Sequence, residues 1–152
     1  MAEFTHFKKD GSAVMVDVHE KPDTYRAASA TGTIQVSPEV FAAVRDHTAK
    51  KGDVLGVARL AGIMGAKKNA ELIPLCHIVP LTNCEVTFTT DENTNSITAV
   101  CTTSCVGKTG VEMEALTGVS VALLTVYDMC KAIDKRMTLG EIHLVEKHGG
   151  KS

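Results

Sequence analysis

The chain has 152 residues, which is enough for one domain with its own core and too few for two domains of ordinary size. The formal net charge is −2, so the chain lacks the basic excess of a general nucleic-acid or membrane-surface binder. Aromatic residues make up 4% of the sequence and Trp is absent, which excludes a stacking platform for bases and predicts an aliphatic core.

The N-terminus and the cysteines bear on where the protein works. Residues 1–13 are polar and expected to be flexible, and they contain no apolar core of a signal peptide. No continuous apolar run is long enough to cross a membrane. The cysteine count is odd and no C-x-x-C motif occurs, so we expect reduced thiols in a cytoplasmic protein. The cysteines are Cys76, Cys84, Cys101, Cys105 and Cys130.

The first half of the chain predicts strands followed by two helices. Residues 14–18 are a short strand candidate, and residues 28–36 alternate between apolar and polar side chains as in a half-buried strand. Ser37 before a proline is a typical helix start, and this helix is expected to extend to about residue 47. Asp53 is placed to cap a second helix, which is expected to end at about residue 68.

The second predicted helix contains Gly56, Gly62 and Gly65. Each glycine weakens a helix interior by about 1 kcal/mol relative to Ala. We therefore expect them where the backbone packs closely against another element. The helix also carries the apolar residues Val54, Val57, Leu60, Ala61 and Met64.

The second half of the chain predicts a hairpin, a long helix and a last strand. Two prolines predict a stiff connection over residues 70–81, with neither helix nor central strand. Alternating segments on both sides of the polar turn 91–96 predict a hairpin. A long amphipathic helix is expected over about 111–134, and a strand after Gly140. The resulting order, βαββαβ with the first helical part in two pieces, predicts an α+β, ferredoxin-like domain. Its helices would pack on one face of an antiparallel sheet.

Pairs of lysines flank the second predicted helix, with Lys51 just before it and Lys67 near its end. The helix dipole favours cations at a helix C-terminus, which accounts for Lys67 but not for Lys51. The pairs are either solvated surface residues or the receptors of a polyphosphate. In an acidic chain, local basic pairs favour a small phosphorylated ligand over a long polyanion.

Two loop features are candidate ligand contacts. His77 lies in the stiff connection, where it is either an acid, base or phosphate donor or a structural residue that binds a loop carbonyl. Residues 107–110, with the sequence GKTG, lie between a predicted strand and a predicted helix. Their amides and lysine suit an anion, and the alternative is a tight turn with a solvated lysine; the spacing does not match a Walker motif.

The long predicted helix carries acidic residues near both ends. Glu112 and Glu114 lie in its first turn, where acids stabilise a helix by about 0.3–1 kcal/mol. Asp128 and Lys131 have i,i+3 spacing and fit either a surface ion pair or an acid–base pair among apolar side chains. No metal-ligand spacing such as H-x-x-x-H occurs, so we expect no protein-bound metal.

Two long segments carry a specific resemblance to a known family. The first contains KGDV at 51–54, ARLAGI at 58–63 and LIPLCH at 72–77. The second contains KTGVEMEALT at 108–117 and YDMCKA at 127–132. These sequences resemble the molybdenum cofactor biosynthesis protein C family, the cyclic pyranopterin monophosphate synthases. The resemblance covers nearly the whole chain.

The resemblance implies a lyase formed by a single catalytic domain over residues 14–152. Its reaction converts (8S)-3′,8-cyclo-7,8-dihydroguanosine 5′-triphosphate into cyclic pyranopterin monophosphate and pyrophosphate. It implies no resident cofactor, with Mg²⁺ at most accompanying the triphosphate. By resemblance, the catalytic residues are Lys51, His77, Asp128 and Lys131. The substrate-binding residues implied in the same way are Lys67, Leu75, Cys76, His77, Glu112, Met113 and Glu114.

The resemblance also implies a homohexamer built as a trimer of dimers, and helix geometry favours a site shared between subunits. On one straight helix, Glu114 and Asp128 would lie about 21 Å apart along the axis. We expect two copies of this helix to cross antiparallel about Val121, where small residues such as Gly118 leave room for another backbone. Glu114 of one subunit would then lie near Asp128 of the other.

Departures from the family pattern are few. Ile78 and Val79 separate His77 from Pro80, whereas a proline usually follows the histidine directly, and none of the acid, base or lysine positions is altered. The alternative function is a ligand-binding regulatory module with the same fold, because a fold alone does not fix a function. Such a module needs ligand donors but no set of acid and base groups, so the number of ionisable candidates favours the enzyme.

Overall fold

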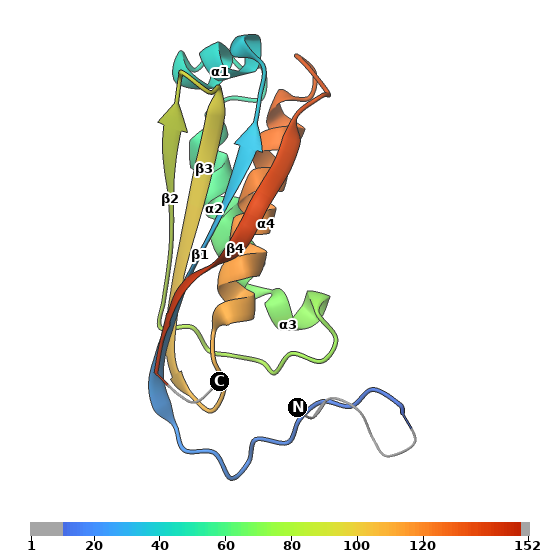
Figure 1. The fold of residues 1–152 in the computed structure, drawn as a ribbon, viewed down its shortest axis with the longest axis vertical. Coiled ribbons are helices and arrows are strands. Elements are labelled where there is room, and N and C mark those ends of the chain that lie inside the picture. Colours follow the sequence, from blue (N-terminus) through green and yellow to red (C-terminus); the bar gives the residue numbers. More distant parts are fainter. Residues whose placement is uncertain (1–10, 150–152) are drawn as a thin grey trace.

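The fold is known from a computed structural model, and the structure describes residues 11–149. Most of the predicted flexible segment 1–13 therefore lies outside the described residues. The segment that precedes the first strand, residues 11–23, is called the N-terminal segment below. Figure 1 shows it at the end of the molecule where the last long helix begins.

A single antiparallel sheet carries the fold, with four strands in the order β2-β3-β1-β4. Two long helices, α2 and α4, lie side by side against one face of this sheet (Figure 1). This arrangement confirms the predicted ferredoxin-like α+β fold. The strands are β1 (Thr24–Gln35), β2 (Asn83–Asp91), β3 (Ser96–Gly107) and β4 (Thr138–His148). The helices are α1 (Pro38–Arg45), α2 (Val54–Lys67), α3 (Asn69–Leu72) and α4 (Glu112–Cys130).

Local sequence signals start the helices where they were expected. The Ser37 hydroxyl accepts a hydrogen bond from the backbone N–H of Val40 at 3.1 Å and so caps α1. The Asp53 carboxylate accepts one from the backbone N–H of Gly56 at 3.2 Å and caps α2. Each cap satisfies a backbone donor that the first helical turn leaves without a partner.

A glycine seam, formed by Gly62 and Gly65 of α2 against Gly118 of α4, joins the two long helices. A Cβ added to Gly62 would lie 2.9 Å from the Gly118 carbonyl oxygen, and one added to Gly65 would lie 2.7 Å from the Val121 side chain. These distances leave no room for a side chain, which confirms the prediction for Gly62 and Gly65. The prediction was wrong for Gly56, which is exposed and whose added Cβ would meet only the Asp53 side chain of the helix cap.

The seam decides which residues of α2 are buried. Its buried residues are Val54, Ala58, Gly62, Gly65 and Ala66. Larger apolar residues of α2 are exposed instead, with Val57 at 45%, Leu60 at 62% and Met64 at 42%. The physical reason is that only small side chains fit where α2 approaches α4, so the larger ones point away from it.

The seam also bears on the predicted crossing of two α4 helices about Val121. Gly118 and Val121 contact α2 of the same chain, as the Gly62 and Gly65 distances show. The small residues of α4 leave room for another backbone, as expected, but that backbone belongs to the same subunit. Val121 itself is only partly buried, so the crossing of two α4 helices stays a prediction.

Three predicted boundaries differ from the structure. Residues 14–18 form no strand, because the N-terminal segment runs away from the sheet and only Ala13 within it forms an isolated β-bridge (Figure 1). The connection after α2 begins with the short helix α3, where helix was not expected. Helix α4 ends at Cys130 rather than near residue 134, and the following turn brings Met137 back into the core at 8% exposure.

Helix α4 is long and apolar enough to cross a membrane by length and composition alone. Half of the relevant window is buried inside the structure, and α4 packs against β1, β3 and α2 (Figure 1). Its apolar residues are therefore those of a core helix.

Candidate active site

A cavity of about 340 Å³ opens where α4 begins. Its wall contains His77 from the stiff connection together with Glu112 and Glu114 from the first turn of α4. These three side chains lie together because the connection from α3 to β2 passes the start of α4 (Figure 1). The other predicted substrate-binding residues in the same wall are Leu75, Cys76 and Met113.

Glu114 is the buried acid of this cavity, with only 4% of the residue exposed. The Asn69 side-chain amide donates a hydrogen bond to its carboxylate at 3.2 Å, and the Thr117 hydroxyl donates to the Asn69 side-chain oxygen at 2.7 Å. Burial raises the pKa of Glu114, and the hydrogen bond from Asn69 only partly opposes this. Glu114 is thus a carboxyl group that keeps its proton more readily than a free one.

Two lysines that were not predicted as site residues also lie at this end of the molecule. Lys147 of β4 places its ammonium 2.8 Å from the Glu112 carboxylate, and each side chain is 26% exposed. Lys21 of the N-terminal segment lines the cavity itself. No local spacing in the sequence predicts that either lysine lies near α4. The order of the strands and the path of the chain bring them there. Their charges suit a phosphorylated ligand.

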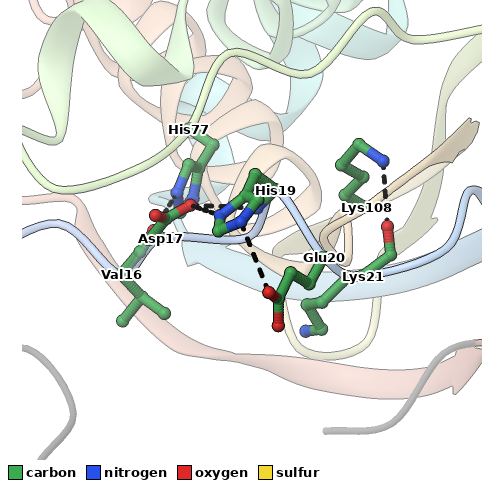
Figure 2. Close-up of polar contacts among 7 residues, drawn as sticks. All are labelled: Val16, Asp17, His19, Glu20, Lys21, His77 and Lys108. Atoms are coloured by element: carbon green, nitrogen blue, oxygen red, sulfur yellow. Dashed lines mark hydrogen bonds and ion pairs between the residues drawn. The ribbon is translucent and has the colours of Figure 1, made fainter.

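The N-terminal segment is attached beside the cavity through its backbone (Figure 2). His77 Nε2–H donates a hydrogen bond to the Val16 carbonyl. Lys108 donates one to the Lys21 carbonyl at 2.9 Å and lies 3.6 Å from the Asp23 carboxylate. Lys108 is thus engaged by the chain itself, which favours the turn over the anion site at residues 107–110.

A second cluster, called the Asp128 cluster, lies at the opposite end of α4. The Lys51 ammonium lies 3.0 Å from one carboxylate oxygen of Asp128, and the Lys131 ammonium lies 3.1 Å from the other. Gly52, with φ of +107°, allows the turn that presents Lys51. Hydrogen bonds from Lys51 and Lys131 lower the pKa of Asp128, so it is held as a carboxylate between two cations.

Lys67 belongs to neither group. It ends α2 and lines a cavity of about 480 Å³, with Ile63 and Cys84 in the same wall. The predicted site residues therefore fall into three places on one chain. The cavity residues and the Asp128 cluster are separated by about four turns of α4, or about 21 Å.

The model of the MoaC family matches residues 15–150 of this sequence. The chain belongs to the MoaC family. Two curated relatives, both named cyclic pyranopterin monophosphate synthase, come from Clostridium perfringens strain SM101 / Type A and strain 13 / Type A. Each is 55% identical over 150 residues, which cover 99% of this chain and 95% of the relative.

The family match spans every residue of the cavity wall and of the Asp128 cluster. It agrees with the resemblance carried by the segments at 51–77 and 108–132. Within residues 11–149, no group of three or more His, Cys, Asp or Glu side chains is arranged to hold a metal ion. The absence of a protein-bound metal remains a prediction, which elemental analysis after dialysis will test.

Proposed function

We propose that this chain is a cyclic pyranopterin monophosphate synthase. It would convert (8S)-3′,8-cyclo-7,8-dihydroguanosine 5′-triphosphate into cyclic pyranopterin monophosphate and pyrophosphate. The observation that carries the proposal is 55% identity to two proteins of that name over almost the whole chain. The alternative, a regulatory module that binds a ligand without converting it, has no such support.

The chemistry of the reaction fits the groups that the chain offers. The purine imidazole ring opens, the pterin and pyran rings form, and the α-phosphate closes onto a sugar hydroxyl while pyrophosphate leaves. These steps move protons and gather negative charge, so they require acid and base groups together with cations. Glu114 supplies a carboxyl whose pKa is raised by burial, and the Asp128 cluster supplies a carboxylate flanked by two ammonium groups.

We assign the proton transfers to Lys51, Asp128 and Lys131, with His77 as a further acid–base group. Substrate binding falls to Lys67 and to the remaining predicted residues of the cavity wall. In this proposal the enzyme has no resident cofactor, and Mg²⁺ acts only by accompanying the triphosphate. The proposed location is the cytoplasm, where five free thiols remain reduced.

We propose further that each site combines two subunits of a homohexamer. Two observations support this. The cavity residues and the Asp128 cluster lie too far apart on one chain for a single small ligand to bridge them. In addition, Val57, Leu60 and Met64 form an exposed apolar row on α2 that a second copy would cover. The subunit contact does not involve Gly118, because α2 already covers that residue of α4.

The activity is tested by incubating the purified protein with the cyclised guanosine triphosphate and measuring pyrophosphate and cyclic pyranopterin monophosphate. We expect equal amounts of both products, with Lys131→Ala as the inactive control. Nucleotide binding by calorimetry without any pyrophosphate release would contradict the proposal and support the regulatory module.

The shared site is tested by complementation between Glu114→Ala and Asp128→Ala. Each variant alone is expected to be inactive. After dissociation and mixing in equal amounts, a mixed pair has one intact site and one doubly altered site, so about a quarter of wild-type activity returns. Mass-labelled subunits show whether exchange has occurred. Complete exchange without any return of activity would mean that each site belongs to one chain.

A further inference from the structure

Two cysteines outside the proposed catalytic groups lie next to each other in the sheet. Cys84 is on β2 and Cys101 is on the neighbouring strand β3. The register pairs Cys84 with Thr103 and Val86 with Cys101, so the two cysteines are diagonal neighbours on the face that packs against the helices. Their sulfur atoms are 3.9 Å apart.

The surroundings of the two thiols are very different. Cys84 is half-buried in the wall of the 480 Å³ cavity that Lys67 also lines. Cys101 is completely buried, and its sulfur lies against α4 so closely that a Cβ added to Gly118 would be 2.6 Å from it. A reagent that enters the cavity therefore meets Cys84, and Cys101 is reached only through Cys84.

The electrostatics of the pair follow the same asymmetry. The hydrogen bond from Cys101 lowers the pKa of the Cys84 thiol, and the positive charge of Lys67 acts in the same direction. That hydrogen bond and burial both raise the pKa of Cys101. Cys84 is thus the thiol that ionises and attacks, and Cys101 is the neighbour that remains protonated.

We propose that Cys84 and Cys101 form an oxidisable dithiol, in which a peroxide oxidises Cys84 and Cys101 then closes a disulfide. In the first step the Cys84 thiolate attacks the peroxide O–O bond, giving a sulfenic acid and one molecule of water after proton uptake. In the second step Cys101 gives up its proton and displaces the sulfenic hydroxyl group as a second water. The two electrons lost by the sulfur pair reduce one hydrogen peroxide.

Closure of the bond requires the two sulfurs to approach from 3.9 Å to about 2.05 Å. Cys101 is fixed in the core by Gly118, so the movement falls to Cys84. Cys84 is the second residue of β2, an edge strand, and it directly follows the loop that leads out of the stiff connection. Closure therefore requires Cys84 to move at this end of the edge strand.

The first test oxidises the intact protein with hydrogen peroxide and maps disulfides in peptides without reduction. In wild type we expect one link, between Cys84 and Cys101, that dithiothreitol removes. Cys101→Ser should give no link and should instead accumulate a Cys84 sulfenic acid that dimedone traps. The matched control is Cys105→Ser, which removes another buried thiol of β3 and leaves the link intact. Oxidation of Cys76 without any Cys84–Cys101 link would overturn the proposal.

The second test measures alkylation of Cys84 by iodoacetamide at neutral pH, with the other thiols followed by mass spectrometry. Replacing Cys101 by Ala removes the hydrogen-bond donor and should slow Cys84 about tenfold, whereas Cys101→Ser keeps a donor and should restore most of the rate. Equal rates in all three proteins would show that Cys101 does not activate Cys84. Neither test uses the enzyme assay, so either test can fail or succeed independently of the test of the proposed function.

Discussion

The two ends of α4 carry the same kind of group in opposite surroundings. Glu114, at the start of the helix, is 4% exposed and hydrogen-bonded to the neutral amide of Asn69. Asp128, near the end, has a half-exposed side chain between the ammonium groups of Lys51 and Lys131. Burial raises the pKa of the first carboxyl, and the two cations lower the pKa of the second. One helix therefore carries a carboxyl that takes up a proton more readily than usual at one end and a carboxyl that takes one up less readily at the other.

The difference shows how one short chain can supply both acid and base groups. The desolvated end is suited to give a proton, and the cationic end is suited to hold negative charge and transfer protons through its lysines. Neither role follows from residue type alone, because both groups are ordinary carboxylic acids. The variants below separate the contributions of the two ends.

The largest effect is expected at the cationic end, in Lys131→Ala. Loss of a group that transfers protons should lower turnover by about 10²–10⁴-fold. Lys131 is exposed and lies just beyond the last turn of α4, so circular dichroism and oligomeric state should not change. Initial-rate measurements with purified variant protein test this. Activity above about a third of the wild-type rate would remove Lys131 from the mechanism.

A second variant tests the packing that holds the two ends in a fixed relation. In Gly62→Ala the new Cβ meets the Gly118 carbonyl oxygen at 2.9 Å, where neither helix backbone can yield cheaply. Overpacking of this kind typically costs about 1–3 kcal/mol of unfolding free energy. The matched control is Gly140→Ala, whose Cβ would meet nothing within 4 Å. Urea denaturation of both proteins decides the matter, and equal midpoints would mean that the seam is not tight.

A third variant, Glu114→Gln, tests the buried end through pH. The folded-state pKa of Glu114 is raised above its ordinary value of 4.5, so the folded protein binds more protons than the unfolded chain above that pH. Stability attributable to Glu114 therefore falls as pH rises from 4.5 to the raised pKa. Glu114→Gln should lack this fall, which denaturation at several pH values will show. Parallel pH profiles for the two proteins would contradict the burial argument.

The smallest effect is expected for the thermal stability of Asp128→Asn. The folded-state pKa of Asp128 is lowered, so its ion pairs stabilise the protein above the ordinary value of 3.8 and are lost as pH falls through the lowered pKa. Exposed ion pairs contribute little, because solvent screens them. At neutral pH the melting temperature should therefore stay within about 1 °C of wild type while activity is lost. A large drop would show that the cluster is structural.

Local signals in the sequence encode much of this fold, but not all of it. The order of the elements, the two helix caps and the hairpin follow from local signals, and all were predicted. The exposed face of α2 was not, because hydrophobic patterning assumes that large apolar residues such as Leu60 point inward. In α2 the small glycine and alanine residues point inward instead, because they pack against α4. This arrangement depends on the partner helix and cannot be read from the sequence of α2 alone.

The candidate site was likewise predicted only where its contacts are local in the sequence. Asp128 and Lys131 are one helical turn apart, so their ion pair was visible in the sequence as one of two alternatives. Asn69, Lys147 and Lys21 were missed because they reach the first turn of α4 through chain topology. No local pattern encodes such contacts, although the buried Asn69 is unusual enough to mark a functional neighbourhood once burial is known.

The length of α4 fixes which parts of the chain can gain or lose residues. Each residue inserted into a helix turns everything beyond it by about 100° and advances it by about 1.5 Å. An insertion between Gly118 and Asp128 would swing Asp128 away from Lys51, and one between Glu114 and Gly118 would place Glu114 on the wrong face. The hairpin turn at 91–96 carries no such constraint, because exposed loop tips accept extra residues readily. Length variation among homologues should therefore collect in the hairpin, while the interval from Glu114 to Asp128 keeps a constant count.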